Sequence, residues 1–175
     1  MIMRALAILA VSGTALAATH QHAPSPYAGH ERREIAALSE QEIADLRNGA
    51  GMSMALPAEL NGYPGPRHVL DLADALALTA VQRATAERLM TEMRAKAIPL
   101  GERVIEAEAA LGRLFGSNVA SASEASAATD RVARLRGELS SAHLVAHIGM
   151  REALTVEQRV AYDRLRGYGA GHGKH

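Results

Sequence analysis

Two long stretches of this chain carry apolar residues at alternating spacings of three and four, which is the period of an α-helix. The first stretch runs from Thr79 to about Phe115, with its stripe at Ala86, Leu89, Met93, Ala97, Leu100, Val104, Ala107, Leu111 and Leu114. The second starts at Ser121 and has its stripe at Ala128, Val132, Leu135, Leu139, Ala142, Ala146, Gly149 and Ala153. Only "GSNVASAS" separates the two, so the sequence predicts a long antiparallel helical hairpin.

A repeated pentapeptide marks where helices begin. Its residues are Leu78, Thr79 and Gln82 in "LTAVQ", and Leu154, Thr155 and Gln158 in "LTVEQ". In each copy the threonine hydroxyl can accept from the amide of the glutamine, whose side chain can reach back to the threonine amide. We therefore predict that both motifs are helix caps, each placed just after a leucine that is buried in the preceding segment.

Shorter helices are predicted to flank the hairpin. "SEQE" at Ser39 is a capping box with Gly49 placed to end its helix, and Pro66 suits the first turn of another. Pro99 removes one backbone hydrogen bond from the first long helix and is expected to bend it. A two-helix hairpin buries little surface alone, so we expect the flanking helices and a second copy of the chain to close it. The predicted fold is all-α, cradle-like and homodimeric.

The ends of the chain indicate export. Residues 1–17 resemble a cleavable signal peptide, with Arg4, a short apolar core and the small residues Ala15 and Ala17 before the cleavage point. Residues 18–38 are predicted to be a flexible leader, 39–166 the helical domain and 167–175 a disordered tail. No later segment is apolar enough to span a membrane. We therefore expect a periplasmic protein.

Composition excludes several classes of function. The 19 basic and 19 acidic residues balance, which argues against a nucleic-acid partner, and the chain has no cysteine for disulfides or a thiol switch. No nucleophile elbow, phosphate loop or paired-carboxylate site is present, so we expect no enzymatic activity.

His143, His147 and Met150 are the candidate metal ligands. They stand at i, i+4 and i+7, within roughly 60° of one another on a helix and beside the predicted stripe. Two imidazoles four residues apart can chelate a transition ion, and a thioether adds a soft ligand. Leu144 replaces the general base of a metalloprotease motif. The alternative is that both histidines pack against carboxylates of a neighbouring helix.

Further ligands are possible elsewhere in the chain. The sequence does not decide whether His68, Asp71 and Asp74 approach the histidine pair. The terminal histidines are expected to be solvated or weak metal scavengers; they are His20, His22, His30, His172 and His175. Met90 and Met93 fit ordinary core packing, with a soft surface for unfolded clients as the alternative.

The signal peptide, the helical length and the two LTxxQ elements together resemble the Spy/CpxP family of periplasmic stress proteins and chaperones. That family is related to periplasmic heavy-metal sensor and resistance proteins, and the likeness covers roughly residues 39–166. It implies a dimeric helical cradle that either protects unfolded proteins without ATP or holds metal through histidine, carboxylate and methionine. His143, His147 and Met150 are the local candidates for such ligands.

Three functions therefore stay open. A chaperone would bind unfolded or signalling proteins in the periplasm. A metal-responsive protein would bind Zn(II), Ni(II), Co(II) or copper through helix histidines. A helical adaptor would dock only on a membrane-bound sensor.

Overall fold

The computed structural model describes residues 25–168, and every regular element in this range is a helix. In chain order they are the 3₁₀-helix η1 (His30–Arg32), α1 (Glu40–Arg47), α2 (Leu56–Glu59), α3 (Pro66–Asp71), α4 (Ala80–Gly116), α5 (Ala122–Ala153) and α6 (Val156–Leu165). The predicted all-α class is confirmed for this part of the chain. The predicted signal peptide, the first part of the leader and most of the tail lie outside the described residues.

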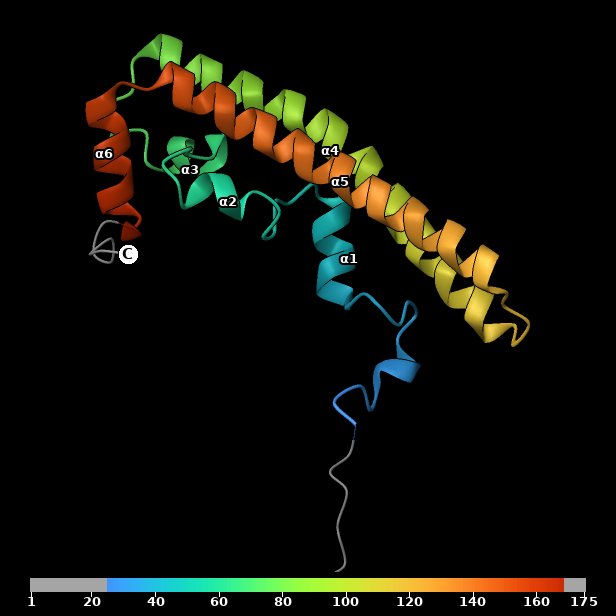
Figure 1. Ribbon diagram of the computed structural model, residues 1–175. Coiled ribbons are helices and arrows are strands. Elements are labelled where there is room, and N and C mark those ends of the chain that lie inside the picture. Colours follow the sequence, from blue (N-terminus) through green and yellow to red (C-terminus); the bar gives the residue numbers. More distant parts are fainter. Residues whose placement is uncertain (1–24, 169–175) are drawn as a thin grey trace, which may run out of the picture.

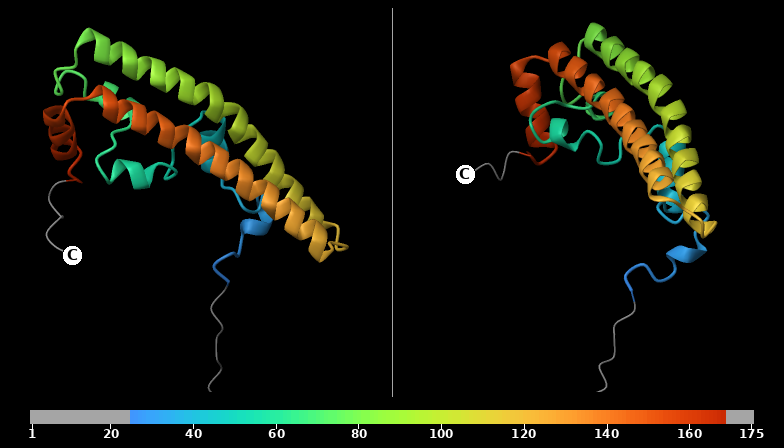
Figure 2. Two further views of the ribbon diagram at one scale, coloured as in Figure 1. Left: turned by 45° about the horizontal axis from the view of Figure 1, so that its top comes forward. Right: turned by 45° about the vertical axis from the view of Figure 1, so that its right-hand side comes forward.

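Helices α4 and α5 form the predicted hairpin, a long curved body against which α1, α2 and α3 pack (Figure 1). Pro99 lies inside α4, and the helix continues through it with a curvature that is visible in both views of Figure 2. Near the C-terminal end of α5, a Cβ atom on Gly149 would lie 2.9 Å from Cδ2 of Leu89 on α4. The absent side chain of this glycine therefore lets α4 and α5 approach closely.

The second half of the buried ridge of α5 differs from the predicted stripe. Its buried residues are Val132, Leu135, Leu139, His143, Ala146 and Met150. Ala142 and Gly149 are only half-buried, so the prediction that the histidine stripe lies beside the seam is wrong for His143 and Met150. The physical reason is that other segments cover this flank of α5. The Ser140 hydroxyl donates to the Met54 carbonyl in the segment before α2 at 3.0 Å, and Met150 is buried in one cluster with Val69 of α3 and Tyr162 of α6.

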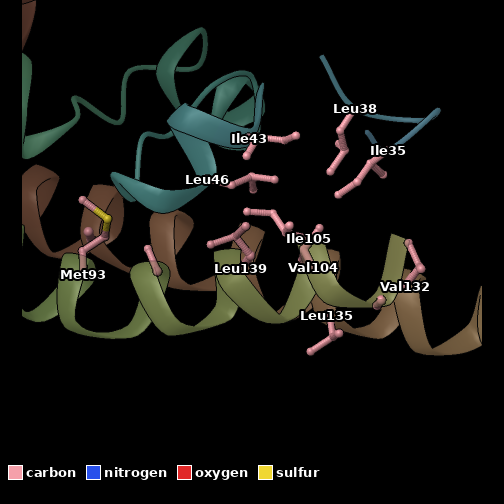
Figure 3. Close-up of a cluster of buried hydrophobic side chains, with 13 residues drawn as sticks. Ile35, Leu38, Ile43, Leu46, Met93, Val104, Ile105, Val132, Leu135 and Leu139 are labelled. Carbon is pink, nitrogen blue, oxygen red and sulfur yellow. The ribbon is translucent and has the colours of Figure 1, made fainter. Parts of the chain in front are cut away.

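Helices α1, α2 and α3 fill the concave side of the hairpin (Figure 1). Figure 3 shows how Ile43 and Leu46 of α1 face Leu139 and Val104 of the long helices. Ile35 and Leu38 belong to the same buried cluster, although the sequence placed both in a flexible leader. The structure thus differs from that prediction because two apolar side chains at the end of the leader have a hydrophobic surface to cover.

The three predicted capping boxes are formed, a fourth is formed at Ser121, where the second long helix was predicted to start, and the two LTxxQ copies do more than cap. Thr79 and Thr155 cap α4 and α6 as expected. Gln82 Nε2 donates to Gln158 Oε1 at 2.8 Å, and Gln158 Nε2 donates to Gln82 Oε1 at 3.0 Å. The repeated motif therefore joins the starts of α4 and α6 through a reciprocal amide pair.

A second buried cluster holds α6 against the end of the hairpin. It consists of Val69, Leu76, Ala86, Met150, Leu154 and Tyr162. Beyond α6, the Tyr168 hydroxyl donates to Glu59 at 3.0 Å, although the sequence assigned residue 168 to the tail. Within residues 25–168, no helix is long and apolar enough to cross a membrane.

Candidate metal-binding pocket

A pocket of about 420 Å³ opens where the α1–α2 connection and the start of α3 meet the two long helices. We call it the histidine pocket. The residues that line it are Asp45, Asn48, Gly49, Ala50, Gly51, Gly65, Pro66, Arg67, His68, Met90, Met93, Arg94, His143, Ala146 and His147. The structure therefore brings both predicted helix histidines to one cavity, together with His68 and two methionines.

His143 is a buried histidine with an unused ring nitrogen. Its exposed fraction is 4%, and its Nε2 atom is buried with no hydrogen-bond partner among the described residues. Burial, and to a lesser extent the neighbouring His147, lowers the pKa of this imidazole. The ring is therefore neutral at pH 7, which is the state in which an imidazole binds metal.

His147 has one nitrogen committed and one available. Its Nδ1 atom lies 2.7 Å from the carbonyl oxygen of Tyr63. Because a carbonyl oxygen only accepts, Nδ1 must carry the proton, and Nε2 of the neutral ring then keeps its lone pair. Nε2 faces Gly65, where an added Cβ atom would lie 3.0 Å away. A backbone carbonyl that holds Nδ1–H is the usual outer partner of a metal-ligating histidine.

The methionine that the helical spacing indicated, Met150, is not the one that reaches the histidine pocket. Met150 is fully buried in the cluster around α6 and does not line the histidine pocket. Met90 and Met93 of α4 line the pocket instead. Met93 is also part of the buried core and Met90 packs against it. This placement fits the packing role that the sequence predicted for both, and it leaves Met93 too covered to form a client-binding surface.

The remaining candidate metal ligands lie in different parts of the structure. His68 lines the histidine pocket, and its Nδ1 atom lies 3.6 Å from Asp71 Oδ2. Asp74 is exposed and pairs with Arg83 at 3.2 Å. His30 Nε2 accepts a hydrogen bond from the guanidinium of Arg33 at 2.9 Å, at the surface. The other terminal histidines lie outside the described residues.

Within residues 25–168, no three histidine, cysteine, aspartate or glutamate side chains are placed to hold one metal ion. The histidine pocket is lined by the imidazoles of His68, His143 and His147, by the carboxylate of Asp45 and by the thioethers of Met90 and Met93. Thioethers favour soft ions such as Cu(I), and they bind Zn(II), Ni(II) and Co(II) less well.

Sequence reasoning missed the residues that position His147. Tyr63 supplies the carbonyl acceptor, and its ring lies under the guanidinium of Arg151 at 4.2 Å. Glu59 Oε2 lies 3.7 Å from Nδ1 of His147. The only signal in the sequence was the turn "NGYPGP", whose rigidity gives no hint that it meets a helix about 85 residues further on.

No protein-family model, curated protein or solved structure matches this chain.

Proposed function

We propose that this protein is an exported, non-enzymatic, metal-responsive binding protein whose histidine pocket holds one soft transition-metal ion, with Cu(I) preferred. The observation that carries the proposal is the buried Nε2 atom of His143, which has no partner and belongs to a ring that lines the same pocket as His147. A buried polar atom without a partner is costly, and bound metal would remove that cost.

The donor set supports a soft ion over a hard one. His143 and His147 would supply two neutral nitrogens, and Met90 or Met93 would supply the thioether sulfur. His68 is held beside Asp71 and would serve at most as an outer ligand. When bound, the ion would supply charge and fixed geometry to the pocket rather than a reaction.

Client binding is the second candidate, and a further candidate is docking on a membrane-bound sensor. Apolar side chains are exposed on the outer faces of α5 and α6, including Val145, Ile148, Val156 and Val160. A cradle-type chaperone would use the concave side of the hairpin, but α1, α2 and α3 occupy that side here (Figure 1). We therefore place metal binding first.

The proposal is tested by anaerobic titration of the signal-cleaved chain with Cu(I) against a chromophoric chelator. Calorimetry with Zn(II), Ni(II) and Co(II) runs in parallel. The chain should keep residues 25–38 and 168, because Ile35, Leu38 and Tyr168 contribute to the fold. Metal scavenging is removed instead by replacing the outlying histidines with Gln: His20, His22, His172 and His175.

We expect one Cu(I) per chain and weaker binding of the other three ions. His143→Ala and His147→Ala should each lower the Cu(I) affinity by more than the roughly 10- to 100-fold that is typical when a hydrogen-bond partner of a ligand is lost. Met90→Leu and Met93→Leu identify the thioether, and Met150→Leu is the matched control that should leave affinity unchanged. The proposal would be refuted if Cu(I) does not bind 1:1. It would also be refuted if Zn(II) binds tightly with an affinity that neither Met90→Leu nor Met93→Leu changes.

Gly65→Ala should weaken Cu(I) binding without removing any donor. The new Cβ atom would lie 2.9 Å from Cε1 of His147, so the ring has to move. The backbone at Gly65 is extended, with φ of −78°, so alanine is not strained there. We expect the affinity to fall more than about tenfold, and the free energy of unfolding to fall by about 1–2 kcal/mol.

The control is Gly137→Ala, where an added Cβ atom meets nothing within 4 Å. Equal Cu(I) affinities for Gly65→Ala and Gly137→Ala would show that the ring of His147 is not a ligand. Urea unfolding of the metal-free variants separates loss of folding from loss of binding.

A further inference from the structure

Glu59 is a buried carboxylate that joins parts of the chain far apart in sequence. It is 7% exposed, and its Oε1 atom accepts hydrogen bonds from the Tyr162 hydroxyl at 2.5 Å and the Tyr168 hydroxyl at 3.0 Å. Its Oε2 atom accepts from the amide of Gly65 at 3.2 Å. One carboxylate thus ties α2 to the start of α3 and to α6 with the residues after it.

The same carboxylate lies beside a residue of the histidine pocket. Oε2 lies 3.7 Å from Nδ1 of His147, and the Gly65 amide that it binds belongs to a residue lining the pocket. A second cavity, of about 430 Å³, is lined by Glu59, His147, Arg166 and Tyr168. Arg166 Nε lies 3.5 Å from Oε1 of Glu59. Only the width of Glu59 therefore separates His147 from the polar contacts that hold the C-terminal helix.

Helix α6 depends strongly on such contacts. It has one buried side chain, that of Tyr162, and its other links to the body include the Gln82–Gln158 pair. Val156, Val160 and Leu165 are exposed. A helix anchored at so few points is the kind of element that opens locally at low free energy.

We propose that Glu59 is a positioning residue that couples metal binding at His147 to the docking of α6. This rests on the proposed function. His147, when ligated through Nε2, must keep its proton on Nδ1 and gains positive charge beside Oε2 of Glu59. That charge strengthens the attraction holding Glu59 in place, and with it the hydrogen bonds from Tyr162 and Tyr168. By linkage, docked α6 strengthens metal binding to the same degree.

The test is hydrogen exchange of the α6 backbone amides in the full signal-cleaved chain, with and without one equivalent of Cu(I). In the wild type we expect Cu(I) to slow this exchange by about 5- to 150-fold, the usual range of coupling between two sites. In Glu59→Gln, Cu(I) should still bind, about 10- to 100-fold more weakly, and the exchange of α6 should no longer respond.

Glu108→Gln is the matched control. Glu108 is also a buried glutamate, at 7% exposure, and it binds Arg136 at 2.6 Å in the hairpin away from the pocket. Its loss should leave both Cu(I) affinity and the α6 response intact. If Glu59→Gln fails to fold, Tyr162→Phe keeps the ring in its cluster, removes one donor to Glu59, and should reduce the response.

The outcomes separate the two proposals. Cu(I) binding that is lost in His147→Ala but leaves α6 exchange unchanged in the wild type would overturn the coupling and keep the metal site. Equal effects of Glu59→Gln and Glu108→Gln would overturn it as well. No 1:1 Cu(I) binding in the wild type would overturn the proposed function, and the coupling with it.

Discussion

Replacing Gly101 with alanine is expected to destabilise the protein by about 3 kcal/mol or more. A Cβ atom at this position would overlap the carbonyl oxygen of Leu46 and lie 2.8 Å from its carbonyl carbon. These are backbone atoms at the end of α1, so no side-chain rotation relieves the contact. The Leu46 carbonyl also accepts from the amide of Gly49, whose φ of +62° ends the helix. Relief therefore requires α1 to move off α4 and to open the core beneath it.

The matched control is Gly112→Ala, which lies on the same helix and has open space around its Cβ position. There alanine should stabilise the protein by about 0.5–1 kcal/mol, because it loses less conformational freedom on helix formation. Urea unfolding of both variants measures the difference. If the two have the same free energy of unfolding, α1 does not sit on α4 as described.

Local features of this fold were predictable from the sequence, because each is decided within a few residues. The capping boxes beginning at Ser39, Thr79, Ser121 and Thr155 depend on two side chains three positions apart, and all four are formed. The hairpin followed from two stripes of equal period. These predictions needed no knowledge of which helix lies next to which.

The ligand set failed at the point where such knowledge is needed. Spacing at i, i+4 and i+7 puts His143, His147 and Met150 on one side of a helix, but Met150 lies about 10 Å further along the axis than His143. Over that distance the surroundings of α5 change: His143 lines the histidine pocket, whereas Met150 is buried in the cluster around Tyr162. The thioethers that reach the pocket come from α4, and nothing in the sequence aligns α4 with α5.

Glu59 was beyond prediction for a related reason. It stands in "LPAEL" with no pattern around it, and its tyrosine donors lie 103 and 109 residues away. The scarcity of aromatic residues was the one available signal, since Tyr162 and Tyr168 are two of only four tyrosines. Neither their scarcity nor their spacing identifies a carboxylate partner.

Breaking the amide pair of the two LTxxQ motifs is expected to give the second large loss of stability. The bonds of this pair also explain why both motifs end in glutamine. Each Oε1 accepts from its own threonine amide, at 3.1 Å for Thr79 and 3.0 Å for Thr155. Each Nε2 also donates to a backbone carbonyl, Gln82 to Ala153 at 3.0 Å and Gln158 to Leu76 at 3.2 Å. A glutamate would still cap its own helix but has no hydrogen to donate.

Gln82→Glu and Gln158→Glu are therefore each expected to lower the free energy of unfolding at pH 7 by about 2–4 kcal/mol. Each change leaves a half-buried carbonyl without its donor and places a carboxylate against the oxygen of the other glutamine. The control is Glu124→Gln in the box at Ser121. Glu124 is exposed and its carboxylate hydrogen-bonds to Ser121 within its own helix start, so this change should cost much less than either glutamine substitution.

A double-mutant cycle with Gln82→Ala and Gln158→Ala tests whether the two side chains act as one unit. Because the first substitution already breaks both bonds of the pair, the second should cost less in its presence, with a coupling energy of about 1 kcal/mol or more. Costs that simply add would mean that the motifs cap their helices independently. Strong coupling would instead show that the two copies of the pentapeptide form one tertiary contact, which holds the start of α6 against the start of α4.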